Sequence, residues 1–178
     1  AFGRLRQLQQ FLQRQQAGAL AGAAADLGGQ GQGGVLAGDV EVPRALAAHI
    51  DLGYEGLTQL AIEGDALQLR EALTNMIDNA LRYVPAGGRV TLRVGETPSM
   101  ALLMVEDDGP GVAAQDREHL FERFWRGNGT LAEGCGLGLA IVREIAIAHG
   151  GRVSLHDGEG GRGLCVEVEL PLRGELTP

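Results

Sequence analysis

The 178-residue sequence predicts an α+β fold, a two-layer α/β sandwich in which three helices cover one face of a mixed, mostly antiparallel sheet. Two observations carry this prediction. Apolar residues recur at helical spacing in the segments 42–49, 65–84 and 136–150. Between and after these segments, short stretches alternate polar and apolar residues or run apolar, as strands do when one side of a sheet is buried. Helices and strands in this order favour helices packed on one side of a sheet.

Cap and turn residues set the bounds of these elements. Pro43 stands near the start of the first helix, where its missing N–H breaks no hydrogen bond. Asp65 is a candidate N-cap for the long second helix, and Gly150 with Gly151 ends the third. The expected strands cover 50–56, 59–64, 89–94, 100–107, 152–157 and 163–171.

The chain divides into three parts by composition. Residues 1–41 combine an amphipathic, Gln-rich stretch over 1–17 with an Ala- and Gly-rich linker. That stretch is either the stub of an upstream helical domain or a segment without fixed structure, and the sequence leaves both open. Residues 42–171 form the predicted domain, and 172–178 form a C-terminal tail.

Composition excludes several classes of function. Lys and Arg number 15 against 23 Asp and Glu, a net charge of −8, so a nucleic-acid partner is not expected. Cys135 and Cys165 form no metal-binding pair. No apolar run of about 18 residues and no signal peptide are present, which predicts a cytoplasmic domain without a membrane helix.

Two asparagines stand out in the long helix. Asn75 and Asn79 are four residues apart and therefore lie on one face, followed by Arg82 and Tyr83 one turn later. Asparagine is mildly unfavourable inside helices, so the pair suggests a site that needs neutral oxygen ligands, such as Mg²⁺ bridging phosphates. The alternative is an ordinary solvated polar face.

Three further segments carry candidate chemistry. Asp107 ends an apolar strand and begins the run DDGPG, which offers a carboxylate to an exocyclic amine and a backbone that passes close to a ligand, although such runs also make simple turns. The segment GCGLG over 134–138 opens a helix, so its N–H groups could face phosphate, without the Lys of a Walker loop. The segment FERFWR over 121–126 is either a packing anchor or part of a mobile lid.

These four segments, in this order, resemble the Bergerat-fold ATPase superfamily, which includes gyrase, Hsp90 and the histidine kinases. LREALTNMIDNALRYVPAGG is similar to the histidine-kinase N box, VEDDGPGV to the G1 box, FERFWRG to the F box and GCGLGLAIVREIAIAHGG to the G2 box. The F box points to the histidine kinases within the superfamily. IDLGYEG further resembles sensor kinases of the tricarboxylate-transport type.

The resemblance implies ATP and Mg²⁺ as ligands and assigns a role to each matching position. Asn79 would bind Mg²⁺, with Asn75 and Arg82 at the triphosphate and Tyr83 lining the nucleotide pocket. Asp107 would hold the adenine amine. The remaining cofactor-binding positions of the pattern are Gly109, Gly111, Phe121, Gly134, Gly136, Leu137 and Gly138, with a lid over about 112–135.

The resemblance also implies a kinase rather than a hydrolase. Superfamily members that activate water carry Glu one turn before the metal-binding Asn, and here Asn75 occupies that position; a neutral amide is a poor base. None of the four histidines, His49, His119, His149 and His156, has a phosphoacceptor context, and His149 is expected to be structural. The phosphoacceptor would therefore belong to a separate dimerisation domain of a parent kinase anchored in the inner membrane, with a response regulator downstream. This chain alone is expected to be monomeric.

Two other classes compete with this interpretation. An anti-sigma-factor serine kinase shares the ATPase fold but lacks the F box. A degenerate interaction module would have lost ATP binding, whereas all four boxes are intact here. Nucleotide binding and phosphotransfer to a supplied histidine domain separate the three classes.

Overall fold

The computed structural model describes residues 38–57, 62, 64–125 and 135–172, with side chains from Pro43 onward. Within these residues the strands form one five-stranded sheet in the order β1-β2-β3-β5-β4. β1 and β2 are parallel and every other neighbouring pair is antiparallel. The strands are β1 (Asp51–Gly56), β2 (Arg89–Glu96), β3 (Met100–Asp107), β4 (Arg152–Asp157) and β5 (Leu164–Pro171).

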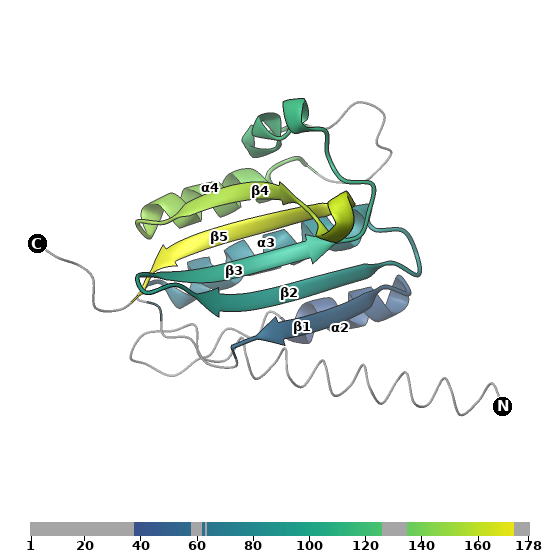
Figure 1. Cartoon of the computed structure of the whole chain (residues 1–178), viewed down its shortest axis with the longest axis horizontal. Coiled ribbons are helices and arrows are strands. Elements are labelled where there is room, and N and C mark those ends of the chain that lie inside the picture. Colours follow the sequence, from purple (N-terminus) through teal and green to yellow (C-terminus); the bar gives the residue numbers. More distant parts are fainter. Residues whose placement is uncertain (1–37, 58–61, 63, 126–134, 173–178) are drawn as a thin grey trace, which may run out of the picture.

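The described helices lie on one face of this sheet, as the view from the opposite face shows (Figure 1). They are α2 (Gly38–Ala47), α3 (Ala66–Tyr83) and α4 (Gly138–Ala148). Short 3-10 turns cover Ala114–Asp116, Glu118–Phe121 and Glu159–Gly161. The predicted two-layer fold with a mixed sheet is therefore confirmed. Among the described helices, none combines the length and apolar character needed to cross a membrane.

The long helix α3 forms where its sequence pattern predicts. Asp65 is its N-cap, with Oδ1 accepting the backbone N–H of Leu67 at 2.8 Å and of Gln68 at 3.1 Å. These bonds satisfy two of the N–H groups that a helix start leaves free. Its buried face packs on the sheet and on α4 through Leu69, Ala72, Leu73, Met76, Ile77, Ala80 and Leu81.

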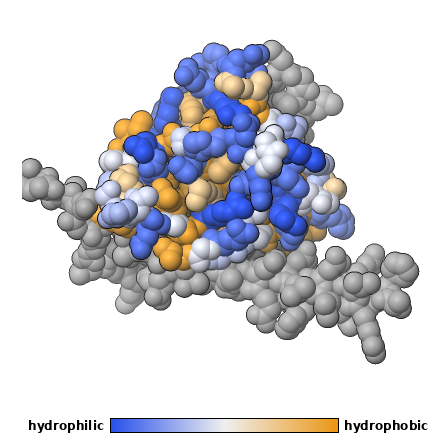
Figure 2. Space-filling view, viewed as in Figure 1, coloured by the Kyte–Doolittle hydropathy of each residue, from blue (hydrophilic) through white to orange (hydrophobic). Residues whose placement is uncertain are grey.

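The strands alternate between the helix-covered face and the open face. Val90, Leu92 and Val94 of β2 are buried toward the helices, whereas Arg93 lies on the open face and forms ion pairs with Glu55 and Glu106. Arg152 of β4 pairs there with Glu169 of β5 at 2.6 Å. Figure 2 shows hydrophilic side chains over much of this face, with apolar patches between them.

Four local expectations differ from the structure or lie wholly or partly outside the described residues. α2 begins at Gly38, so Pro43 lies inside the helix rather than at its first turn, where it removes one intrahelical hydrogen bond. In the expected strand 59–64, only Ile62 and Gly64 are described, and Ile62 makes an isolated bridge with Leu172. The expectation for 1–17 lies outside the described residues, as does the part over 126–134 of the lid expected over about 112–135.

Candidate nucleotide-binding site

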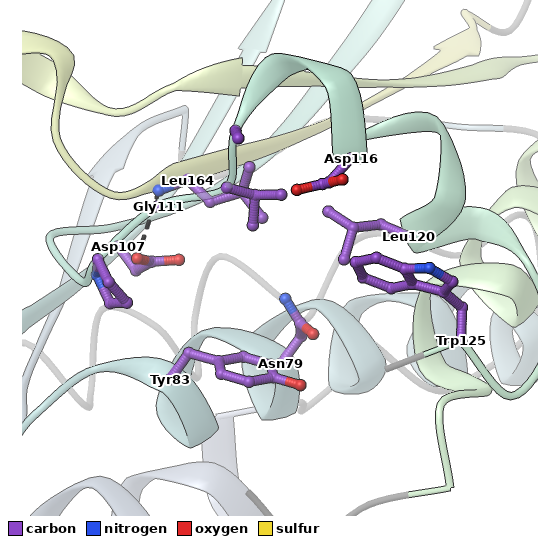
Figure 3. A pocket seen from close by; sticks show the side chains of 11 residues that line it. Asn79, Tyr83, Asp107, Gly111, Asp116, Leu120, Trp125 and Leu164 are labelled. Carbon is purple, nitrogen blue, oxygen red and sulfur yellow. Dashed lines mark hydrogen bonds between the residues drawn. The ribbon is translucent and has the colours of Figure 1, made fainter. Parts of the chain in front are cut away.

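A cavity of about 250 Å³ opens at the end of β3, between the C-terminal half of α3 and the segment that follows β3 (Figure 3). Its wall is assembled from segments far apart in the sequence. The lining residues are Asn79, Tyr83, Asp107, Pro110, Gly111, Val112, Ala113, Asp116, Leu120, Trp125 and Leu164.

Asp107 is the buried carboxylate of this cavity, with 6% of the residue exposed. Its Oδ1 accepts the backbone N–H of Gly109 at 2.9 Å and of Leu164 at 3.3 Å. Oδ2 has no hydrogen-bond partner among the described residues, and the carboxylate faces the cavity (Figure 3). Burial raises the pKa of Asp107, and the two backbone hydrogen bonds partly oppose that rise. The cavity therefore presents one oriented acceptor to an incoming donor.

Two glycines allow the backbone to cross beside this carboxylate. A Cβ on Gly163 would lie 1.7 Å from the backbone oxygen of Asp107, and one on Gly111 would lie 2.8 Å from the oxygen of Gly163. Both residues also have left-handed φ angles, +74° and +71°. The β4–β5 hairpin can thus lie directly against the end of β3, which brings Leu164 into the cavity wall.

The four candidates on α3 divide into two pairs. Asn79 and Tyr83 line the cavity, and Figure 3 shows both side chains pointing into it. Asn75 does not line it; its Nδ2 donates to the backbone oxygen of Glu71 at 2.9 Å. Its Oδ1 faces the start of α4, where a Cβ on Gly138 would lie 3.2 Å away.

Arg82 is also absent from the cavity wall. Its Nη2 lies 2.5 Å from Oδ2 of Asp78, and the other oxygen of that carboxylate lies 2.5 Å from Nη2 of Arg44 on α2. Asp78 therefore joins the two arginines and ties α2 to α3.

The segment between β3 and α4 contributes different residues from those expected. Phe121 is half-buried against the core, and the guanidinium of Arg143 lies 5.5 Å from its ring centre, so it occupies an anchoring position outside the cavity wall. Leu120 and Trp125 line the cavity instead. The Trp125 indole stacks on the His119 ring, with centres 6.0 Å apart and an interplanar angle of 18°.

The glycines before α4 have separate positions. Gly136 has a φ of +67°, and its backbone oxygen accepts the N–H of Phe124 at 2.9 Å. This hydrogen bond holds the two ends of the stretch between Phe124 and Gly136 together. Gly138 begins α4, whose first N–H groups have no helical partner. Gly136, Leu137 and Gly138 are not part of the cavity wall. Gly134 lies outside the described residues.

Sequence patterns did not indicate several of the lining residues. Val112, Asp116 and Leu120 belong to no position with a distinctive local pattern. Leu164 lies 57 residues after Asp107 in the sequence, and it reaches the site because β5 pairs with β3. Trp125 carries a usable signal, since it is the one tryptophan of the chain and stands in the glycine-flanked aromatic segment.

Comparison with known proteins identifies the class. Residues 64–174 match the family model described as histidine kinase-, DNA gyrase B- and HSP90-like ATPase. This match covers more than half of the chain, and the chain belongs to that family.

The relatives narrow the class to sensor kinases. The sensor protein kinase PmrB of Pseudomonas aeruginosa is 45% identical over 111 residues, which cover 62% of this chain and 23% of that protein. Among solved structures, the mycobacterial sensor histidine kinase MprB is 34% identical with a TM-score of 0.66, covering 76% of this chain and 93% of that one. Full-length ShkA in complex with AMPPNP is 30% identical with a TM-score of 0.68, and the match covers 88% of this chain and 30% of that one. The chain is an ATP-binding catalytic domain of the sensor histidine kinase type, and it spans about a quarter to a third of the length of the first curated relatives.

Proposed function

We propose that this domain binds Mg-ATP and donates the γ-phosphate to a histidine on a separate dimerisation and phosphoacceptor domain, for relay to the receiver domain of a response regulator. The observation that carries the proposal is the geometry of Asp107. Two backbone donors hold one of its oxygens, and the other faces a cavity walled by Tyr83 and Asn79.

Adenine suits this acceptor because its exocyclic amine is a hydrogen-bond donor. Guanine presents a carbonyl oxygen at the equivalent position, which would face the carboxylate and be repelled. Apolar side chains, among them Val112 and Leu164, give the faces of a flat base a dry surface. ATP is accordingly the favoured nucleotide.

Magnesium would enter as part of the nucleotide complex. Among the described residues, no group of three or more His, Cys, Asp or Glu side chains could hold a metal ion. The Asn79 amide points into the cavity and offers one neutral oxygen. Mg²⁺ usually keeps several waters and is held by few protein ligands together with phosphate oxygens, so a single amide fits this role. When bound, the ion would neutralise phosphate charge.

The chain's own groups would hold the triphosphate beyond Asn79. The free N–H groups at the start of α4 attract anions, and Arg82 would reach the phosphates by exchanging its partner Asp78. Asn75 is tied to the backbone of its own helix and its Oδ1 faces Gly138. Since a neutral amide cannot take a proton from water, hydrolysis should be slow and the γ-phosphate should await a histidine.

The organisation of the parent protein is part of the same proposal. Residues 42–171 would be the catalytic domain, 1–41 a connection to the phosphoacceptor domain and 172–178 a tail. The domain would work in the cytoplasm, where ATP and response regulators are found, below a parent kinase anchored in the inner membrane. Dimerisation would belong to the parent, and this domain would be a monomer. The likeness to sensor kinases of the tricarboxylate-transport type stays a prediction.

Two measurements test the proposal together. Calorimetric titration of the chain with ATP should show Mg²⁺-dependent binding, with GTP as the control nucleotide. Incubation with labelled ATP and a separately produced phosphoacceptor domain should then give acid-labile, base-stable phosphate on that domain. Binding without transfer would leave an ATP-binding module, and equal affinity for GTP would contradict the role given to Asp107.

A further inference from the structure

One wall of the cavity combines a carboxylate with an aromatic face. Asp116, Leu120 and Trp125 all come from the segment between β3 and α4. In Figure 3, the Asp116 carboxylate points into the cavity beside Leu164, and the Trp125 indole stands at the end away from Asp107. The Asp116 side chain forms no hydrogen bond or ion pair with any described residue. Among the described residues it is therefore an acceptor without a hydrogen-bond partner, and it is aimed into the site.

We infer that Asp116 and Trp125 form the ribose subsite of this domain, with the carboxylate accepting the ribose hydroxyls and the indole packing against the sugar. The inference rests on the proposed function and adds a contact that selects the sugar. The exocyclic amine and the glycosidic nitrogen of adenine lie on opposite sides of the ring system. A base whose amine meets Asp107 therefore directs its sugar toward the end of the cavity where Asp116 and Trp125 stand.

The chemistry of Asp116 suits a sugar better than a phosphate. An ionised carboxylate is an acceptor only, with room for two hydroxyl donors. Beside a triphosphate it would meet like charge, which is unfavourable in a partly enclosed site. Hydroxyls are neutral donors, and hydrogen bonds to an ionised acceptor are the stronger kind.

Neighbouring residues hold this wall in place. Arg117 donates from Nε to the backbone oxygen of Val112 at 3.1 Å and forms an ion pair with Asp157 of β4. His119 stacks on Trp125, and its Nδ1 lies 2.9 Å from Oε1 of Glu122. The segment is thus fastened on both sides of Asp116, so the carboxylate is positioned before the nucleotide arrives.

The test compares ATP with 2′-deoxy-ATP and 3′-deoxy-ATP by calorimetry on the whole chain. The wild type should bind ATP about tenfold more tightly than at least one of the two deoxynucleotides. Asp116→Ala should remove that preference by weakening ATP alone. Glu118→Ala is the matched control, because it removes the same charge from an exposed neighbour outside the cavity wall and should keep the preference. Fluorescence of Trp125, the one tryptophan, should change on binding.

Each outcome decides one question. Equal affinities for ATP and both deoxynucleotides in the wild type would overturn the ribose subsite and leave the proposed function intact. A loss of Mg²⁺ dependence in Asp116→Ala, with sugar selectivity retained, would make Asp116 a metal ligand and equally overturn it. Trp125 fluorescence that does not change on ATP binding would overturn the packing of the indole against the sugar. Absence of any ATP binding would overturn the proposed function and the subsite with it.

Discussion

His149 accepts the backbone N–H of Asp65 through Nε2 at 3.0 Å and thereby joins the end of α4 to the start of α3. Its other ring nitrogen, Nδ1, lies 2.8 Å from the backbone oxygen of Ile145 and donates to it. The ring also packs on Gly64, where an added Cβ would lie 2.5 Å from Cδ2. The structure agrees with the expectation that this histidine is structural, and it connects the two helices that lie nearest the site.

His149→Ala should therefore destabilise the domain. Two hydrogen bonds and a packing contact are lost, which we expect to lower the free energy of unfolding by about 1–3 kcal/mol. Chemical denaturation monitored by circular dichroism measures the change. His156→Ala is the control, because among the described residues that exposed ring has one hydrogen bond, with Ser154, and a 3.9 Å contact with Glu167, so its loss should change stability by less than about 0.5 kcal/mol. Equal effects of the two substitutions would contradict the joining role.

Asp107→Asn should weaken ATP binding while stabilising the empty domain. The amide keeps an oxygen for Gly109 and Leu164 but places an NH₂ group against the adenine amine. Because the folded state raises the pKa of Asp107, its contribution to stability is complete at acid pH and is lost as pH rises through the folded pKa. Above about pH 4, the free energy of unfolding of Asp107→Asn should therefore exceed that of the wild type by a growing amount.

Denaturation of both proteins across pH 4 to 8, with ATP titrations at neutral pH, measures this pair of effects. Asp108→Asn removes the same charge from an exposed neighbour that accepts the N–H of Arg89, and it should leave ATP affinity unchanged. If the stability advantage of Asp107→Asn over the wild type shrank with rising pH, the pKa of Asp107 would be lowered by folding and not raised.

Gly163→Ala should disrupt the end of β3. Its Cβ would lie 1.7 Å from the oxygen of Asp107, so overpacking and left-handed strain should together cost about 3 kcal/mol or more, with loss of ATP binding. Gly161 has a similar φ of +76° with open space around it, so Gly161→Ala should cost only about 1–2 kcal/mol and leave ATP affinity intact. Thermal melts and calorimetry on the two variants separate the cost of left-handed backbone strain, which both share, from the cost of steric overlap with Asp107, which only Gly163→Ala has.

Asn79→Ala should lose the Mg²⁺-dependent part of ATP affinity. We expect about a tenfold loss in magnesium and little change when the metal is chelated, because only the amide contact is removed. Gln68→Ala truncates an amide on the exposed face of the same helix and provides the control. The same loss in both conditions would instead assign Asn79 to a contact with the nucleotide itself.

The two cysteines should differ in reactivity. Burial raises the pKa of Cys165 to about 11, so at pH 8 only about one thiol in a thousand is ionised. Cys135 is exposed next to Gly136. One fast thiol per chain is expected with Ellman's reagent, which Cys135→Ser should abolish and Cys165→Ser should preserve. Two fast thiols would mean that β5 opens readily.

Local patterns account for most of the fold. The cap at Asp65, the apolar stripe of α3 and the strand alternation were all predicted, because each depends on residues close together in sequence. Pro43 was misplaced because the helix extends upstream through a segment whose composition indicated a linker. The composition of this segment indicates a low helix propensity, but the packing of α2 against α3 stabilises the helix in spite of it.

The candidate site could be predicted only in part. Asn79, Tyr83, Asp107 and Gly111 stand in recognisable motifs, and the structure brings them to one cavity. Leu164 and Asp116 depend instead on the pairing of β3 with β5 and on the path of an irregular segment, neither of which has a local pattern. The roles of the motif residues stay predictions until ligand binding is measured.

The position of β5 has a consequence for synthesis of the protein. Among the described strands β5 comes last in the sequence, yet it lies between β3 and β4, and the backbone N–H of its first residue donates to Asp107. A nascent chain on the ribosome that has not yet released this strand has an incomplete sheet and no second donor for the carboxylate. Nucleotide capture should consequently begin only after translation has passed β5, so a product truncated before β5 would be unable to compete for ATP.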